Sequence, residues 1–257
     1  MVKLSIITIN LNNKEGLQKT INSVLCQSFL NLEFIIIDGG STDGSVDVIK
    51  EHSEKLAFWV SKPDKGIYNA MNKGIIKSNG LYLLFLNSGD SLVHERIISE
   101  VFDLNIKTDL ILGNIVTKDN VEIKLNYNID LPNIWKYGAH HQAMFIKRSV
   151  FEQIGFYNEN REITADWQFL MQALFRFKKS YTYLDKTISV YDMRGISSKP
   201  ENIKRITKEK KRFMKGNFES HPIFLLQTII FFRKNYHRIR SIPSRVVRIT
   251  SSLSKKS

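Results

Sequence analysis

One stretch decides the fold: Leu32-Glu33-Phe34-Ile35-Ile36-Ile37-Asp38-Gly39-Gly40-Ser41-Thr42-Asp43-Gly44. Its first half is an apolar, largely β-branched run, which stops at an acid and two glycines. A run of this kind without polar alternation predicts a strand that is covered on both faces. Residues 45–54, which follow, have a helical pattern. The stretch therefore predicts a strand, a polar turn and a helix, the repeating unit of an α/β fold.

The same unit recurs along the rest of the chain. Apolar strand-like runs alternate with amphipathic helical patterns, which predicts an α/β fold with a mostly parallel sheet covered on both faces. No G-x-G-x-x-G sequence follows a strand and no Walker A sequence is present, so a dehydrogenase and a P-loop enzyme are disfavoured. The other predicted strands are residues 4–9, 57–60, 81–86, 109–112, 121–125, 181–184 and 188–191, and the other predicted helices are residues 17–25, 66–78 and 166–178.

Composition sets outer limits on the protein. The chain has 257 residues and a single cysteine, which excludes an internal disulfide framework. The apolar run at residues 4–9 is too short and too polar for a signal peptide. No stretch approaches the roughly 20 apolar residues that cross a bilayer. We therefore expect a cytoplasmic protein.

The net charge of +13 is concentrated in the last part of the chain. Residues 201–257 carry 15 Lys and Arg against 3 Asp and Glu, whereas residues 1–200 carry 23 against 22. This shift predicts two domains, a body at residues 1–200 and a basic amphipathic helical extension at residues 201–257. A neutral body without a recognisable binding module disfavours nucleic acid as a partner.

The extension has the composition of a membrane-surface anchor. Residues 204–215 are rich in Lys and Arg, residues 223–232 are apolar, and a second basic run follows. An apolar segment of this length lies in the interface of an anionic membrane but does not span it. The alternative is a pair of C-terminal helices that pack Phe224, Leu225, Ile229 and Phe232 on the body.

Ligands of open α/β sheets bind beyond the carboxyl ends of the strands, and acids gather there in this chain. Asp38 ends the second strand, where a carboxylate can accept hydrogen bonds from a nucleobase while the adjacent glycines admit a ligand. Asp90 follows the most apolar strand within Asn87-Ser88-Gly89-Asp90 and suits a hard divalent cation. The alternative for both is a polar turn that caps the next helix.

Two further segments carry candidate ligand contacts. Lys65 stands at the start of the helix predicted at residues 66–78, where it and the helix N-terminus suit a diphosphate, and Asn72 can face the same cleft. The alternative is a solvated helix start. His140 and His141 are adjacent in an extended segment and point opposite ways, so a joint metal site is disfavoured. A structural histidine is the simpler interpretation.

Asp166 has the most informative position of any acid in the sequence. It lies on the same helical stripe as the apolar residues Phe169, Leu170 and Ala173. A carboxylate that faces the body is costly unless it is paired or used, which favours a functional role. The alternative is a helix N-cap, but no Glu or Gln follows three residues later to complete a capping box.

Together these motifs resemble the family 2 glycosyltransferases, which are nucleotide-sugar enzymes with the GT-A fold. The resemblance covers residues 1 to about 195. The order and spacing of the motifs are specific, and no Q-x-x-R-W sequence of the processive synthases is present. The motifs are Ser5-Ile6-Ile7-Thr8-Ile9-Asn10, Ser23-Val24-Leu25-Cys26-Gln27-Ser28, Phe34 to Gly44, Asp64 to Gly74, Leu86 to Asp90, His141-Gln142-Ala143, Gly155 to Glu159 and Ala165-Asp166-Trp167.

The resemblance implies a role for each site residue. Asp90 matches the metal-binding acid, for Mn²⁺ or Mg²⁺, and Asp166 matches the catalytic base. His141 is a candidate contact for acceptor or donor. Asn87 and Gly89 stand where many members have aspartates, and Ala165 stands where many have an acid. The residues implied in nucleotide binding are Thr8 and Asp38, which would hold the base, with Lys65, Asn72 and Ser88.

The sequence thus predicts an inverting, metal-dependent glycosyltransferase that moves one sugar from a nucleotide-diphosphate donor, expected to be a UDP-sugar, to an acceptor hydroxyl. The basic extension and the resemblance to the family favour a lipid-linked acceptor, such as an undecaprenyl-diphosphate saccharide in bacterial surface-polysaccharide (O-antigen-type) assembly. The expected location is the inner face of the membrane. The alternative is a non-catalytic nucleotide- or carbohydrate-binding module on the same fold. Asp90 and Asp166 discriminate between the two, because a binder needs no base.

Overall fold

The computed structural model describes residues 2–125 and 129–218. The chain forms two compact units, residues 1–210 and residues 211–257. The predicted boundary near residue 200 stays a prediction. The apolar segment at residues 223–232 and the second basic run lie outside the described residues.

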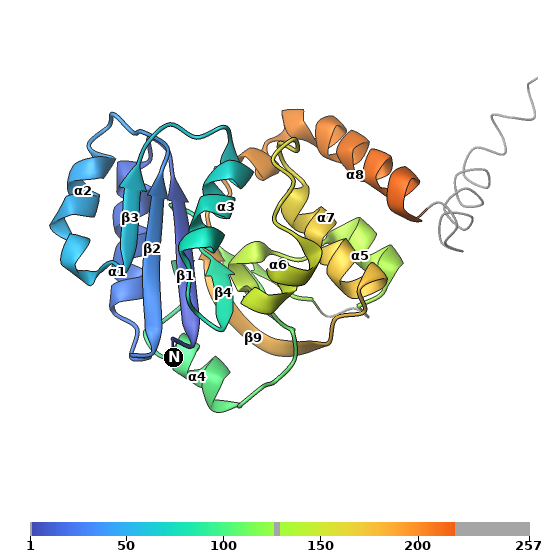
Figure 1. The fold of residues 1–257 in the computed structure, drawn as a ribbon, viewed down its shortest axis with the longest axis horizontal. Coiled ribbons are helices and arrows are strands. Elements are labelled where there is room, and N and C mark those ends of the chain that lie inside the picture. The colour runs from blue at the N-terminus through green and yellow to red at the C-terminus, as the bar shows by residue number, and fades with distance from the viewer. Residues whose placement is uncertain (1, 126–128, 219–257) are drawn as a thin grey trace, which may run out of the picture. The chain divides into compact units, whose positions relative to one another are not determined.

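The first half of the sheet is parallel, as predicted. Strands β1 (Leu4–Asn10), β2 (Leu32–Asp38), β3 (Phe58–Ser61) and β4 (Tyr82–Phe85) lie in the order β3-β2-β1-β4 and all run parallel (Figure 1). The register pairs Asn10 with Asp38, so the two strands end side by side. The α/β fold is confirmed.

Helices cover both faces of this half, as the unbroken apolar strands predict. Leu17 and Ile21 of α1 (Lys14–Leu25) pack with Leu4 and Ile6 in the buried core. On α3 (Ile67–Lys77), a Cβ added at Gly74 would lie 2.4 Å from the side chain of Ile7. Because successive strand residues point to opposite faces, α1 and α3 lie on opposite sides of β1.

The second half of the sheet is mixed. Strand β8 (Met144–Lys147) pairs antiparallel with β4 and β6 (Leu110–Thr117), β9 (Tyr181–Tyr191) runs parallel to β6, and β5 (Ser91–Leu92) and β7 (Glu122–Ile123) add short antiparallel pairs. These antiparallel pairs were not predicted from the sequence. The remaining helices are α2 (Ser45–Glu51), α4 (Ile97–Asp103), α5 (Leu131–Tyr137), α6 (Arg148–Ile154), α7 (Ala165–Met171) and α8 (Ile203–Phe218), with 3₁₀ turns at Ser53–Lys55, His141–Ala143, Ile196–Ser198 and Pro200–Asn202.

Two predicted elements differ from the structure. Strand β9 is continuous, whereas two strands were predicted at residues 181–184 and 188–191. The pairing with β6 shifts register opposite the polar residues Asp185 and Lys186, which explains the gap in the apolar pattern. The helix predicted at residues 166–178 leaves α-helical geometry after Met171, and Gln172–Arg176 forms a π-helical turn. This turn rotates the stripe, so that Phe177 is 39% exposed.

We expect Gly80→Ala to lower the free energy of unfolding by about 1–3 kcal/mol. An added Cβ would lie 2.5 Å from the backbone nitrogen of Ser5 on the central strand, which cannot move aside. Gly195→Ala is the matched control, because its nearest atom would be 3.8 Å away. Urea denaturation of both variants measures the difference. Equal stabilities would contradict the close approach at Gly80.

Candidate active site

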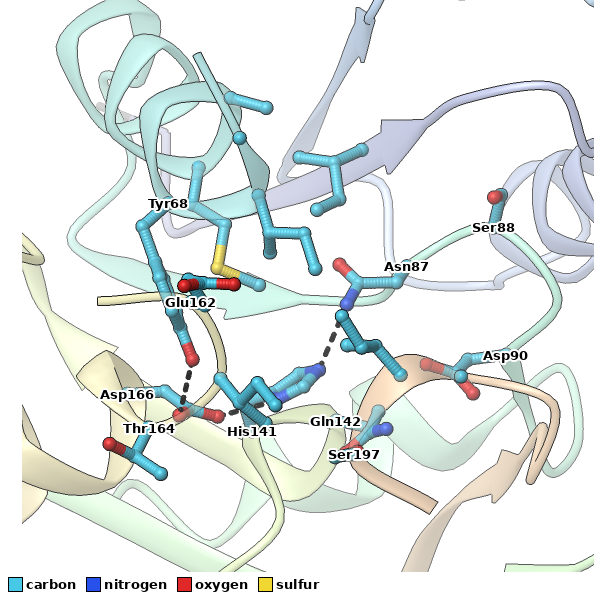
Figure 2. A pocket seen from close by; sticks show the side chains of 18 of the residues that line it. Tyr68, Asn87, Ser88, Asp90, His141, Gln142, Glu162, Thr164, Asp166 and Ser197 are labelled. Carbon is cyan, nitrogen blue, oxygen red and sulfur yellow. Dashed lines mark hydrogen bonds and ion pairs between the residues drawn. The ribbon is translucent and has the colours of Figure 1, made fainter. Parts of the chain in front are cut away.

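A cavity of about 850 Å³ opens at the carboxyl edge of the parallel strands. Its walls come from the ends of β1 and β4, the first turns of α3, residues 138–142, the start of α7, residues 191–197 and α8. Figure 2 shows Asp166, His141 and Asn87 in a row within it, with Asp90 on the far side of His141 from Asp166. A volume of this size is typical of sites that enclose a ligand.

Asp166 is held from three directions. Its Oδ1 accepts hydrogen bonds from the Tyr68 hydroxyl at 2.9 Å and from the backbone N–H of Trp167 at 2.8 Å. Its Oδ2 lies 2.9 Å from Nδ1 of His141 (Figure 2). A carboxylate offers about four lone pairs, so these three bonds leave one on Oδ2. Asp166 is therefore fixed in place and still able to accept a proton.

Asp166 and His141 alter each other's pKa. Burial raises the pKa of Asp166, but the hydrogen bond and charge of His141 outweigh it, and the pKa lies below its ordinary value. Burial lowers the pKa of His141, whereas the hydrogen bond to Asp166 and the charges of Asp166 and Asp90 raise it above its ordinary value overall. The pair therefore keeps Asp166 ionised near neutral pH.

Asn87 completes the row by fixing the ring of His141. Its Nδ2 lies 3.1 Å from Nε2 of His141. An amide nitrogen can only donate, so Nε2 accepts and the ring proton of the neutral form resides on Nδ1, which faces Asp166. The other amide atom of Asn87, the oxygen Oδ1, is buried and has no hydrogen-bond partner among the described residues.

Asp90 has the opposite electrostatic character. It is 3% exposed, and its Oδ1 accepts a hydrogen bond from the backbone N–H of Asp192 at 2.8 Å. Burial raises the pKa of Asp90 to about 6, against the smaller effects of the Asp192 N–H and of His141. Two acids of one cavity are therefore shifted in opposite directions, a pattern that marks functional sites.

Asp90 and its turn fit a hard divalent cation. A backbone bond of 2.9 Å from the Asp90 N–H to the Asn87 carbonyl closes the turn, which contains the Asp90 carboxylate and the unpartnered Oδ1 of Asn87. Oxygen ligands of this kind suit Mg²⁺ or Mn²⁺ that keeps several waters or phosphate oxygens. Within the described ranges no group of three or more His, Cys, Asp or Glu residues could hold a metal, so the protein would supply only part of the coordination shell.

Gly89 leaves room for a second acid beside Asp90. A Cβ at residue 89 would lie 2.6 Å from Oδ2 of Asp192, and the φ of +105° also favours glycine. Asp192 forms ion pairs with Lys118 at 2.9 Å and with Arg194 at 2.7 Å. Hydrogen bonds from these two cations outweigh burial and hold the pKa of Asp192 well below its ordinary value. Asp192 thus lies where a longer side chain at position 89 would clash.

Comparison with known proteins identifies the family. The model of the glycosyl transferase family 2 matches residues 5–231. The chain belongs to this family. An uncharacterized glycosyltransferase of Mycobacterium tuberculosis is 33% identical over 178 residues, 66% of this chain and 68% of the relative. A PGL/p-HBAD biosynthesis glycosyltransferase of Mycobacterium bovis is 28% identical over 198 residues, 74% of this chain and 77% of the relative.

Solved structures confirm the GT-A type of fold. TarS of S. aureus, residues 1–349 in complex with UDP-GlcNAc, superposes with a TM-score of 0.64 at 16% identity and covers 83% of this chain and 66% of that one. The mannosyltransferase PcManGT of Pyrobaculum calidifontis, in complex with GDP-Man and Mn²⁺, gives a TM-score of 0.62 at 14% identity, with 79% and 60% covered. The chain spans 36% of a longer TarS structure.

Four of the residues predicted for this glycosyltransferase from sequence line the cavity, and four do not. Ser88, Asp90, His141 and Asp166 belong to the lining. Thr8, Asp38, Lys65 and Asn72 lie outside it. Neither placement tests the predicted roles, but each of the four outside the lining has another structural explanation.

Asp38 supports the loop that follows β2. It is fully buried, and its two oxygens accept five hydrogen bonds. Burial raises its pKa, but the bonds from Ser41, Ser61 and Asn10 outweigh burial and lower the pKa overall. Gly39, the residue after Asp38, does line the cavity. Asp38 therefore shapes the cavity wall from behind.

Of the other three residues, Thr8 and Asn72 belong to local networks, and Lys65 is exposed. The Thr8 hydroxyl donates to the carbonyl of Leu86 at 2.6 Å and joins β1 to the end of β4. Asn72 is 4% exposed and bonds to Glu159 and to the backbone of Tyr157. Lys65 is exposed at the start of α3. In this structure none of these side chains reaches the cavity.

Several lining residues were not predicted as site residues. Asp192 and Arg194 follow β9. Because ligands bind beyond the carboxyl ends of strands, the strand predicted at residues 188–191 was a signal for both residues. Tyr68 lies in the motif Asp64 to Gly74, but nothing in the sequence shows that its hydroxyl contacts Asp166. Lys210 lies among many lysines and had no distinguishing signal.

We expect Asp38→Asn to destabilise the fold by about 2–4 kcal/mol, because both carboxylate oxygens face donors and an amide nitrogen must oppose one set of them. Asp119→Asn, at an exposed acid, is the control. Thermal unfolding measures the loss. A variant as stable as the wild type that fails to bind UDP would instead support a direct contact between Asp38 and the base.

Proposed function

We propose that this family 2 glycosyltransferase moves a single sugar from a nucleotide-diphosphate donor, a UDP-sugar, to an acceptor hydroxyl with inversion at the anomeric carbon. The observation that supports this proposal is the joint placement of Asp90 and Asp166 in one cavity with opposite pKa shifts. The TarS and PcManGT structures, with UDP-GlcNAc and GDP-Man, support a nucleotide-sugar donor by their fold alone.

In the proposed mechanism Asp166 is the general base. The acceptor oxygen attacks the anomeric carbon, the bond from that carbon to the diphosphate oxygen breaks, and the acceptor proton passes to Oδ2 of Asp166. The low pKa of Asp166 makes it a weak base, so the proton moves late, as the new bond forms. The bonds from Tyr68 and Trp167 hold the carboxylate still during this transfer.

Asp90 is the proposed metal ligand, at the end of the turn that begins at Asn87. A divalent cation bound there supplies a Lewis acid that offsets charge on the departing diphosphate. Arg194 lines the same cavity, where it is ion-paired with Asp192.

For the nucleotide base we propose the end of the cavity at β1 and β2. Oδ1 of Asn10 is buried without a partner among the described residues, and Asn10 lines the cavity with Gly39. An unpaired acceptor of this kind suits an N–H of the base. Thr8 and Asp38 would then act indirectly through β1 and the loop at Gly39, and the predicted contacts of Lys65, Asn72 and Ser88 with the nucleotide stay predictions.

The acceptor and the location in the cell are proposed from the composition of the C-terminal part of the chain. A lipid-linked saccharide at the inner face of a membrane follows from the basic composition of residues 201–257, most of which lie outside the described residues. Among the residues that the structure describes, no helix is both long and apolar enough to span a bilayer. The M. bovis relative is named for PGL/p-HBAD biosynthesis.

Metal-dependent binding of UDP tests the donor site. We expect UDP to bind more tightly with Mn²⁺ than without it in a calorimetric titration, and Asp90→Ala to abolish the difference. Because Asp90 has a pKa of about 6, its contribution should fall about tenfold between pH 7 and pH 5. The UDP phosphates also titrate, so the pH series of Asp90→Ala gives the background. Metal-independent binding in the wild type would contradict the metal assignment.

Turnover by Asp166→Asn tests the enzyme against the non-catalytic alternative. We expect at least about a hundredfold loss of turnover, with the affinity for the UDP-sugar changed less than about twofold. Asp119→Asn should match the wild type, because its side chain is exposed. Wild-type turnover in Asp166→Asn would remove the base assignment, and binding without any transfer by the wild type would favour the binding module.

A further inference from the structure

A lysine is built into the wall of the cavity near Asp166. Lys210 of α8 lines the cavity, and its ammonium group lies 4.6 Å from the centre of the Trp167 ring. It donates a hydrogen bond to the carbonyl of Trp135 at 3.3 Å. Trp167 directly follows Asp166, so Lys210 belongs to the part of the cavity that contains the proposed base.

The helix segment that carries Lys210 is fixed to the loop before Asp166. Glu209, the preceding residue, accepts hydrogen bonds from the Thr164 hydroxyl at 2.7 Å and from the backbone N–H of Glu162 at 3.2 Å. Arg205 forms an ion pair with the Glu162 carboxylate. These contacts hold residues 203–210 against the loop, so the position of Lys210 is set by the fold.

The charge of Lys210 is not neutralised by a neighbouring acid. Two Lys or Arg residues line the cavity, Arg194 and Lys210. Arg194 forms an ion pair with Asp192, whereas Lys210 forms none with any carboxylate in residues 2–125 and 129–218. Burial lowers the pKa of Lys210 to about 8, although the charge of Asp166 opposes this shift. A half-buried cation that forms no direct ion pair is costly, which favours a ligand that supplies the paired anion.

Apolar side chains line this part of the cavity beside the polar lining residues Glu162, Thr164 and Asp166. Ile163 and Trp167 are 7% and 6% exposed, and both line the cavity together with Ile206 of α8. A single cation among apolar side chains suits an amphiphilic ligand that has one anionic group beside an apolar chain or ring. A neutral sugar alone would leave the charge unmatched.

We propose that Lys210 binds an anionic group of the acceptor, a phosphate or a carboxylate, whose apolar portion packs against Ile163 and Ile206. This inference rests on the proposed function in one respect, that Asp166 marks the acceptor side. Asp90, the proposed site of the donor diphosphate, lies on the far side of His141 from Asp166 in Figure 2. Lys210 therefore selects acceptors by charge.

Calorimetric titration of three small probes tests the proposal without any sugar transfer. Hexyl phosphate, hexanoate and the neutral hexyl glucoside are titrated into the full chain saturated with UDP, as wild type and as Lys210→Met, which keeps the apolar stem. We expect the variant to bind at least one anionic probe about tenfold or more weakly and hexyl glucoside equally. The anion that responds distinguishes phosphate from carboxylate.

Two further variants control the experiment. Lys208→Met removes an exposed lysine of the same helix and should bind all probes as the wild type does. Lys210→Arg keeps the charge and should bind the anionic probes within about threefold of the wild type. Circular dichroism confirms that each variant is folded.

Three results would overturn the proposal. The anionic probes could bind Lys210→Met as tightly as the wild type, or the wild type could bind hexyl phosphate and hexanoate no better than hexyl glucoside. In the third result, Lys210→Met loses affinity for UDP instead. The last result would assign Lys210 to the donor. Because the probes do not react, a protein that binds them and transfers no sugar would contradict the proposed function while leaving the role of Lys210 intact.

Discussion

The hydrogen bonds to the carboxylate of Asp166 join parts of the molecule that are far apart in sequence. Tyr68 comes from α3 in the parallel half and His141 from the segment before β8, whereas Trp167 directly follows Asp166 in α7. Through His141 the carboxylate also reaches Asn87, after β4. A buried charge must be compensated, so these elements are constrained to meet at one point. The cavity opens where these elements meet.

The same constraint separates the two functional acids. The pKa of Asp166 falls because the hydrogen bond and charge of His141 help to outweigh burial, whereas the pKa of Asp90 rises because burial outweighs the Asp192 N–H and the charge of His141. Lys118 and Arg194 form ion pairs with Asp192 and not with Asp90. One cavity thus contains a carboxylate that is stable in its charged form and another whose charged form a bound cation would stabilise.

The parallel half of the fold could be predicted from sequence, and four of the predicted site residues line the cavity, because their signals are local. Unbroken apolar runs specify buried strands, and Ser88 and Asp90 directly follow one of them. The antiparallel strands, Asp192 and Tyr68 were missed because their roles depend on pairings between residues far apart in the chain. The role of Asp38 in binding the base stays a prediction, and sequence alone does not show that five internal hydrogen bonds already occupy its carboxylate.

The difference between what the sequence could and could not predict follows the chemistry of the two proposed substrates. The proposed donor end is made of strand ends and the turns after them, where a few residue types at fixed spacing suffice to meet a base and a diphosphate. The proposed acceptor end is made of a loop at residues 162–164, the start of α7 and the first turns of α8. Its specificity depends on how these segments pack, as the position of Lys210 over Trp167 illustrates. Family motifs therefore carry information about the donor, whereas the acceptor must be inferred from side chains that only the folded chain brings together.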